Sequence, residues 1–389
     1  MKILHIHLLG PYTDNWGYQE NVLPRIQYNQ GHEVTVLTNC QKHLPDNSII
    51  NVAPGEYIVD EGVHVIRIKM RKHTKKVAVN SYLFDYPLKK YLNKINPDVI
   101  LLHGLGLGIT NFYIKNYVAK HRECRLYGDV HENYNNVSSN KRDVLHIILR
   151  TFSNHCRKIL YKYYESVLCL TDDCKKFAIE QYKVNESKTI LFPLGYDPYL
   201  INWKNRFDIR NEIREKYGID EKEIVIIHGG KIIPRRNTDI AIKAFEQINI
   251  KNKRLLIFGT ISDEILSEIK SLIDRNSDII YLGNLSQKDY LEHFLASDIA
   301  FFPGGQSVLW QEAIGCGLPL VIKKWSNIEY LNRGGNVIAV DGSDYMEYAK
   351  QLNYIINSHY YREMAQIAET AGRDFFSYER ISNIMLQEK

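Results

Sequence analysis

The sequence lacks the cysteine and histidine spacing that would build a zinc or disulfide framework. Its six cysteines are scattered along 389 residues, with no Cys-x-x-Cys pair and no histidine at the spacing of a zinc site. We therefore expect reduced thiols that are mostly buried. The sequence also lacks an apolar run of roughly 20 residues, the length of a membrane-spanning helix. Its short apolar start, "MKILHIHLLG", has no small-residue cleavage site, so we expect a cytoplasmic protein whose first residues form a strand.

Two common nucleotide-binding signatures are missing as well. There is no GxxxxGK[ST] pattern, so phosphoryl transfer of the P-loop kind is unsupported. There is also no Asp-x-Asp, so a metal ion bridging a diphosphate would have no evident ligands. We expect no metal and no cofactor, and any bound diphosphate would need cationic side chains to neutralise it.

What is present is the composition of an ordinary globular protein, with 44% hydrophobic and 24% charged residues. The length exceeds the roughly 250 to 300 residues at which single cores stop growing, which favours two domains. Residues 1–200 carry 26 Lys and Arg against 19 Asp and Glu, whereas the remainder carries 24 against 26. The basic half indicates an anionic partner, such as a membrane surface or a phosphate-bearing molecule, or merely a basic soluble surface. We expect no nucleic-acid partner.

Short β-branched runs alternate with helical patterns, as in parallel sheets covered by helices on both faces. This pattern predicts two doubly wound α/β domains, at 1–197 and 198–371, with a final helix at about 372–389 that packs back on the first domain. Ligands of such sheets bind at the carboxyl ends of the strands, so the loops there are the candidate sites. The expected strands are 2–9, 32–38, 64–68, 98–104, 125–131, 166–171, 189–195, 223–230, 254–259, 278–283, 298–303, 319–322 and 336–340.

Two loops of the first domain carry candidate groups. In "GPYTDNWGYQE" (10–20), Gly17 precedes a helix whose first amides could face an anion, although a plain turn is an equal alternative. In "GDVHENY" (128–134), His131 follows a strand, where a neutral imidazole could polarise a hydroxyl or carbonyl group. Asp129 and Glu132 flank this histidine and either orient it or only solvate the loop.

Two loops of the second domain carry more. In "HGGKIIPRRNTDIAIKAF" (228–245), Lys231, Arg235 and Arg236 follow a Gly pair and form either a diphosphate clamp or a solvated basic turn. In "FFPGGQSVLWQEAIGCGLPLV" (301–321), "GGQS" supplies small residues ahead of a helix that begins near Ser307. Glu312 lies inside that helix among apolar residues, and two adjacent ribose hydroxyls are natural partners for it. Together the loops indicate a nucleoside-diphosphate site in a cleft between two domains.

In the order and spacing of its segments the chain resembles retaining glycosyltransferases of the GT-B fold, of the family-four type, over nearly its whole length. The matching segments are 17–38, 129–134, 192–197, 229–245, 281–303 and 307–321. The resemblance implies two Rossmann-like domains, with an acceptor bound mainly by the N-terminal one and a nucleotide sugar by the C-terminal one. It also implies transfer without a metal ion and with retention of the anomeric configuration.

The resemblance further implies site residues. Members of the family usually begin the third loop with Gly-Arg and end it with Lys-Gly, where this chain has Lys231 and Arg236-Asn237. The number of cations is unchanged, so we expect diphosphate binding to persist. The implied catalytic residues are His131, Lys231 and Arg236. The implied donor contacts are Gly17, Tyr18, Gly230, Lys231, Arg236, Leu282, Gly304, Gly305, Gln306, Ser307, Val308 and Glu312.

One position departs from the family pattern. The signature is two glutamates separated by seven residues, the first touching the sugar and the second the ribose. Glu312 matches the second, but Gly304 stands where the first would be. Either backbone amides and Gln306 hold the donor sugar, or activity has been lost. We favour an altered donor pocket.

The sequence therefore predicts a hexosyltransferase that uses a nucleoside-diphosphate sugar, preferably a UDP-sugar, in bacterial surface polysaccharide or glycoconjugate synthesis. The alternatives are a catalytically silent GT-B subunit that binds a nucleotide or glycan, and a sugar-nucleotide epimerase of the same fold. Segments 140–167 and 67–76 mix basic, aromatic and aliphatic residues. They either dock on anionic lipid at the inner face of the plasma membrane, as a polyprenyl-diphosphate-linked acceptor would require, or pack on their own domain.

Overall fold

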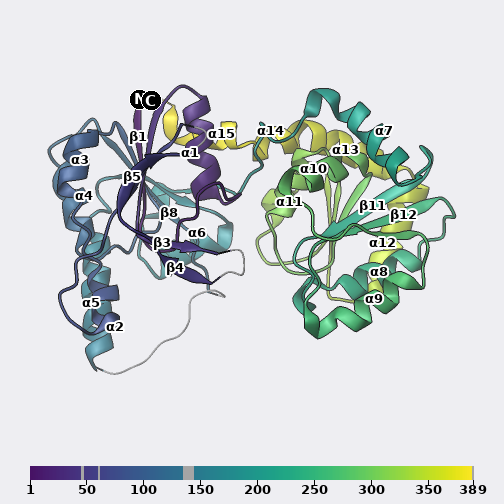
Figure 1. Cartoon of the computed structure of the whole chain (residues 1–389), viewed down its shortest axis with the longest axis horizontal. Coiled ribbons are helices and arrows are strands. Elements are labelled where there is room, and N and C mark those ends of the chain that lie inside the picture. Colours follow the sequence, from purple (N-terminus) through teal and green to yellow (C-terminus); the bar gives the residue numbers. More distant parts are fainter. Residues whose placement is uncertain (45–47, 60–61, 135–143, 388–389) are drawn as a thin grey trace. The chain divides into compact units, whose positions relative to one another are not determined.

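The computed structural model describes residues 1–44, 48–59, 62–134 and 144–387. The chain forms two compact units, residues 1–193 with 382–389 and residues 194–381. Each unit contains a mainly parallel sheet with helices on both faces, which confirms the expected α/β class (Figure 1). Within the described ranges, every helix is too short or too polar to span a lipid bilayer.

The first unit is built on an eight-stranded sheet in the order β10-β9-β8-β7-β1-β2-β6-β5. All neighbours run parallel except β5, which is antiparallel to β6. The sheet strands are β1 (Lys2–His7), β2 (Glu33–Thr38), β5 (Gly55–Ile58), β6 (His64–Arg67), β7 (Val99–Leu102), β8 (Arg125–Val130), β9 (Tyr164–Cys169) and β10 (Thr189–Leu191). The helices are α1 (Gln19–Asn29), α2 (Val77–Leu83), α3 (Lys89–Ile95), α4 (Thr110–Val118), α5 (Val144–Lys158) and α6 (Asp172–Glu180).

Every strand expected in this unit is present. The sequence missed β5 and the separate antiparallel pair β3 (Gln41–His43) and β4 (Ile49–Asn51). These strands are three or four residues long and mostly exposed, so no apolar run marks them. The end of the chain also belongs to this unit, where Ser382 Oγ donates to Gln30 Oε1 at 2.8 Å and Arg125 donates to the carbonyl of Gln387 at 2.9 Å.

The second unit has a six-stranded, wholly parallel sheet in the order β13-β12-β11-β14-β15-β16. Its strands, all expected from the sequence, are β11 (Ile224–Gly229), β12 (Lys253–Phe258), β13 (Ile279–Tyr281), β14 (Ile299–Phe302), β15 (Leu320–Lys323) and β16 (Val337–Val340). Its helices are α7 (Arg206–Lys216), α8 (Thr238–Glu246), α9 (Leu266–Asp274), α10 (Gln287–Ala296), α11 (Leu309–Gly315), α12 (Tyr345–Asn357), α13 (Tyr360–Ile367), α14 (Arg373–Phe376) and α15 (Tyr378–Leu386), the last of which continues into the first unit.

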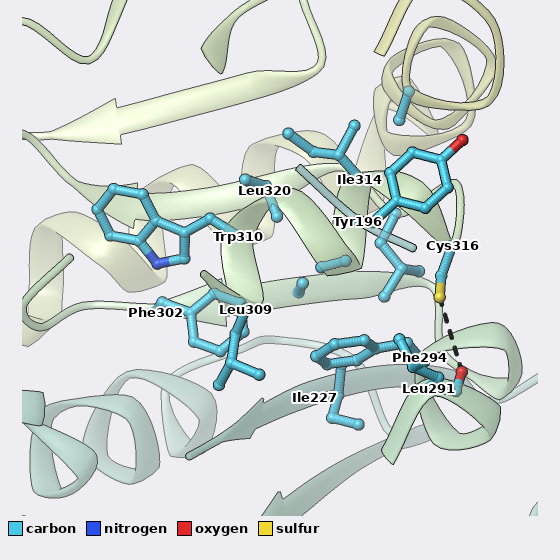
Figure 2. Packing of buried hydrophobic residues seen from close by; sticks show 14 of the residues in the cluster. Tyr196, Ile227, Leu291, Phe294, Phe302, Leu309, Trp310, Ile314, Cys316 and Leu320 are labelled. Atoms are coloured by element: carbon cyan, nitrogen blue, oxygen red, sulfur yellow. Dashed lines mark hydrogen bonds between the residues drawn. The ribbon is translucent and has the colours of Figure 1, made fainter. Parts of the chain in front are cut away.

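Alternate residues of the second sheet feed two cores, one on each face. Val225 and Ile227 of β11 join one cluster, whereas Ile226 between them joins the other. Figure 2 shows the first cluster, in which Phe294 of α10 and Trp310 of α11 pack around the sheet. Both faces of each strand are therefore apolar, which is why these strands read as continuous hydrophobic runs.

The strand order reverses once in each sheet, beside β1 in the first unit and beside β11 in the second. Ranked along the chain, the second sheet has the order 3-2-1-4-5-6 of the doubly wound dinucleotide-binding folds. Crevices form at such switch points because the connections on the two sides leave toward opposite faces. The loops after β1 and β7, and those after β11 and β14, are the ones so placed.

Candidate functional site

A buried carboxylate organises the candidate site of the first unit. Asp129, near the end of β8, is only 1% exposed. Its Oδ2 lies 2.6 Å from Nδ1 of His103 and 3.4 Å from Nε2 of His131, and its Oδ1 accepts from the amide of Gly104 at 2.7 Å. His103 and Gly104 follow β7, the neighbour of β8. The carboxylate therefore links the loops after two adjacent strands and orients His131, a role that the sequence left open.

The attraction within the Asp129–His131 pair outweighs the burial that opposes its charges. Burial would raise the pKa of Asp129, but the positive charge of His131 and hydrogen bonds from His103 and His131 hold it well below its usual range. Packing around the ring would lower the pKa of His131, but Asp129, with smaller contributions from Glu20 and Glu132, raises it to about 9. The raised pKa favours the imidazolium form of His131 at neutral pH, whereas the sequence analysis considered the chemistry of a neutral ring. A cationic ring can stabilise negative charge on a ligand.

The first loop lies close to this pair. Tyr18 precedes α1 and is 52% exposed, with no side-chain hydrogen bond that caps the helix, and Gly17 is exposed beside it. Glu20, in the first turn, lies 3.9 Å from Nε2 of His7 at the end of β1. The sequence missed Gln19, which is 3% exposed and whose amide atoms have no partner among the described residues. Nothing in its sequence position distinguishes this glutamine from an ordinary helix-start residue.

His103, Asp129 and His131 are also the group of described side chains that could hold a metal ion, since their donor atoms lie within 4.8 Å of one another. Both ring nitrogens of His103 are engaged, Nδ1 with Asp129 and Nε2 with Nδ1 of His5 at 3.1 Å. A metal would have to displace the proton of His131 and break the hydrogen bonds of His103. The residues fit a hydrogen-bonded ion pair better than a metal site.

In the second unit the expected cations separate into two kinds. Lys231 and Arg235 are exposed, and Lys231 follows Gly230, whose φ of +102° suits glycine. Arg236 instead turns inward, and its Nη1 donates to the carbonyl oxygens of Gly305 and Gln306. Burial lowers the pKa of Arg236. Its guanidinium therefore holds the fourth loop in place, a role that the sequence analysis did not foresee for this clamp residue.

The fourth loop is tied back through its carbonyl oxygens. Trp325 Nε1 donates to the carbonyl of Gly304 at 3.2 Å, and the amide of Gly305 donates to the carbonyl of Arg235 at 3.0 Å. The amides of Gln306 and Ser307 have no partner in the described part of the chain. Exposed Gln306 and half-buried Ser307 and Val308 lead into α11, which begins at Leu309 rather than near Ser307.

Gly304 sits where a side chain has no room. A Cβ atom placed on it would lie 2.3 Å from the carbonyl oxygen of Arg236, closer than any real contact, whereas a Cβ on Gly305 would meet nothing nearer than 3.7 Å. The missing family glutamate therefore cannot be restored by substitution alone. The 234–236 turn would have to move to admit it.

Glu312 is 4% exposed in α11 and already has protein partners. Gln287 Nε2 donates to its Oε1 at 2.8 Å, and the hydroxyl of Tyr290 lies 3.0 Å from both carboxylate oxygens. Burial raises the pKa of Glu312 to about 7, despite these hydrogen bonds. The sequence identified the acid but not its two partners, which lie on α10. Leu282, after β13, is half-buried and packs against the same apolar cluster as Leu309.

Comparisons with known proteins match both units to glycosyltransferases. Residues 209–374 match the family description "Glycosyl transferases group 1", and residues 27–199 match "Glycosyltransferase Family 4". A GDP-mannose-dependent monoacylated alpha-(1-6)-phosphatidylinositol monomannoside mannosyltransferase of Corynebacterium glutamicum is 26% identical over 148 residues, which are 35% of this chain and 38% of that protein. The aligned part thus spans well under half of that relative.

Solved structures extend the likeness of fold to the whole chain. A glycosyltransferase from Rickettsia africae superposes with a TM-score of 0.68 and 14% identity, covering 99% of this chain and 97% of that one. HepE from Anabaena, solved in complex with UDP, superposes with a TM-score of 0.66 and 15% identity, covering 99% and 98%.

We expect Asp129→Asn to lower the pKa of His131 from about 9 toward its ordinary 6.5, because the neutral amide removes the main opposing charge. Histidine ring signals in an NMR titration would measure this. His228, whose pKa burial lowers to about 4 in the second unit, is the internal control and should not move. The ion pair also predicts a stabilisation that is fully present just below pH 6.5 and is lost as pH rises through about 9. It is lost in acid as well, because the pKa of Asp129 is lower in the folded protein than in the unfolded chain. An unchanged His131 titration would contradict the pairing.

We expect Gly304→Ala to destabilise the second unit by about 1–3 kcal/mol, because the new methyl group forces the Arg236 backbone to move. The matched control Gly305→Ala has room and should change stability by less than about 0.5 kcal/mol. Thermal and urea unfolding of the full chain would measure both variants. Equal stability of the two would refute the close approach of Arg236 to Gly304.

Both halves of the chain match glycosyltransferase families, and each unit has a doubly wound sheet with candidate loops at its switch point. The chain therefore belongs to the group 1, family-four glycosyltransferases with the GT-B fold.

Proposed function

We propose that this protein transfers a sugar from a nucleoside-diphosphate sugar, with a UDP-sugar favoured, to a glycan or lipid-linked glycan acceptor. We infer transfer with retention of configuration, without a metal ion, during bacterial surface polysaccharide or glycoconjugate synthesis. The observation that carries the proposal is the pair of switch-point loops in the second unit. Exposed Lys231 follows one strand, and the unpaired amides of Gln306 and Ser307 follow another. Cations and amides are the groups that bind diphosphates.

Two further side chains, one in each unit, can interact with a bound substrate. Glu312 can accept hydrogen bonds from the two ribose hydroxyls, in competition with Gln287 and Tyr290. In the first unit, the cationic ring of His131 can stabilise negative charge on a ligand bound there. The UDP bound by HepE favours uridine, and the GDP-mannose of the Corynebacterium relative makes guanosine the second base to test.

For the acceptor, a pocket of about 1240 Å³ in the first unit supports an anionic, partly apolar molecule. It opens beside the ends of β1, β2 and β6. Its lining combines the basic Lys69, Lys72 and Lys75 with the apolar Leu8, Met70 and Phe84. A glycan carried on a polyprenyl diphosphate has both characters, which is the acceptor class that we propose.

The test of the function is a thermal-shift screen with UDP-, GDP- and dTDP-sugars, followed by a turnover assay with the sugars that bind. A ligand that binds only the folded protein raises the melting temperature with its concentration. Release of nucleoside diphosphate, with retained configuration in the product, would support the proposal. Binding without transfer or hydrolysis across the panel would favour the silent subunit that Gly304 suggests. Conversion of the nucleotide sugar to its epimer, with or without release of the nucleotide, would favour the epimerase.

The buried acid predicts a pH dependence of donor binding. Glu312 must be ionised to accept from both ribose hydroxyls, so affinity for the nucleotide sugar should rise as pH passes through about 7. The gain should be about tenfold between one unit below and one unit above the pKa. Calorimetry should use an intact nucleotide sugar, because the terminal phosphate of a free diphosphate titrates in the same range. Glu312→Gln should bind more weakly and without this dependence; a flat wild-type profile would rule out ionised Glu312 as the ribose acceptor.

We also propose that the first unit contacts an anionic membrane through α5 and the start of α2. Leu145, Ile147 and Ile148 of α5 are 46%, 45% and 59% exposed, and Val77 at the start of α2 is 81% exposed. The two helices contact each other, and basic residues such as Arg150 and Lys76 lie on the same elements or beside them. Apolar side chains flanked by cations suit the surface of an anionic bilayer. The part of segment 140–167 before residue 144 lies outside the described residues.

Ile148→Asp should weaken co-sedimentation with vesicles containing anionic lipid at physiological salt by about tenfold, because it removes apolar contact and adds repulsion. Ile58→Asp is the matched control, since Ile58 is 71% exposed on β5 of the same unit and should bind as wild type. Vesicles without anionic lipid should bind neither the wild-type protein nor the Ile58→Asp variant. Absence of sedimentation of the wild type with anionic vesicles would remove the membrane proposal and leave the transferase proposal standing.

A further inference from the structure

Behind the Asp129–His131 pair runs a line of buried polar side chains that the proposed reaction does not use directly. Gln27 Oε1 lies 2.7 Å from Nε2 of His5, and Nδ1 of His5 lies 3.1 Å from Nε2 of His103. Nδ1 of His103 in turn lies 2.6 Å from the Asp129 carboxylate. The line crosses from α1 through β1 and the end of β7 to β8. Gln27 and His5 are fully buried, and His103 is 6% exposed.

Burying a line of polar side chains in a parallel sheet costs free energy unless each of them is hydrogen-bonded. His5 occupies the middle of β1 between the apolar Leu4 and Ile6, where a leucine would need no partners. Burial lowers the pKa of His5 to about 3, so its ring is neutral. It also stacks on His103, with the ring centroids 5.3 Å apart. A buried polar network of this kind fixes the geometry of the groups at its end.

The direction of the last hydrogen bond follows from the chemistry of the carboxylate. An ionised carboxylate can only accept, so Nδ1 of His103 carries the proton that it donates to Asp129. Asp129 then has three donors: His103, the amide of Gly104 and His131. Two of the three remain in place when His131 changes its protonation state. The carboxylate can therefore stay ionised and fixed while its partner titrates.

We propose that His103, held by His5 and Gln27, is a positioning residue that keeps Asp129 ionised and aimed at His131, and so sets the pH range in which His131 serves transfer. The part that concerns transfer rests on the proposed function. The charged and titratable groups that face His131 are Asp129, Glu132, Glu20 of α1 and His7 of β1. The histidines that face Asp129 are His103, His131, His5 and His7.

Loss of the His103 donor has a defined consequence. With one donor fewer, the negative charge of Asp129 is less dispersed, so both Asp129 and His131 hold their protons to higher pH. Both the acidic and the basic limb of the pH profile of turnover should therefore shift to higher pH. A residue that only fills space would lower activity or stability and leave the limbs where they were.

Two polar substitutions separate these effects. In His103→Asn the side-chain amide lies near the place of Nδ1 and can still donate to Asp129. In His103→Gln it lies near the place of Nε2 and keeps only the contact with His5. We expect His103→Gln to raise the titration midpoint of His131 by about one unit, and His103→Asn, which keeps the donor to Asp129, to raise it by clearly less. His293→Gln, at a buried histidine of the second unit, is the matched control and should not shift it.

The midpoints are read from histidine ring signals by NMR, with the His131 signal assigned by its loss in His131→Asn. An unshifted midpoint in His103→Gln overturns the proposal. Should that variant not fold, the ring nitrogens of the wild-type protein decide: the proposal requires a protonated Nδ1 on His103, and an unprotonated one overturns it. If the midpoint shifts as expected while no donor sugar is turned over, the positioning role stands and the proposed function fails.

Discussion

The reversal of strand order in each sheet is the constraint on which both candidate sites depend. Beside β1 and β7 in one unit, and beside β11 and β14 in the other, the connections leave toward opposite faces. The strand ends there remain uncovered by crossover helices. His103 follows β7 and Gly230 follows β11, so each unit places polar side chains or backbone groups beside its switch point. The central strands of each sheet are buried on both faces, in the second unit by two apolar clusters.

Because both faces are sealed, the sequence could predict the sheets and the loops that follow their strands. It could not predict which way a loop side chain turns. Lys231 and Arg236 both appear as cations after a Gly pair, and nothing in their spacing distinguishes them. The turn at 234–236 carries the second guanidinium back to the carbonyls of Gly305 and Gln306. Those carbonyls lie on another strand connection, about seventy residues further along the chain.

The charge of His131 was unpredictable for a similar reason. Its sequence neighbours, Asp129 and Glu132, were visible as either orienting groups or loop solvation. What fixes Asp129 is the tertiary contact with His103, 26 residues earlier, and through it His5 on another strand. Adjacent parallel strands bring these histidines together at one sheet edge. A residue that looked like a neutral catalytic imidazole is therefore a cation held by a buried acid.

Gly304 and Arg236 depart from the family pattern as a single structural change. The Arg236 backbone occupies the place of a side chain at Gly304, and the Arg236 guanidinium binds the loop that follows. The glutamate of the family is thus absent, and the cation at 236 is engaged by the carbonyl oxygens of Gly305 and Gln306. Trp325 and Asn237, which donate to the carbonyls of Gly304 and Pro303, hold the rearranged loop. A loop held by these specific contacts suits a pocket reshaped for a different donor sugar better than a site in decay, and on this ground we propose an altered specificity rather than a silent subunit.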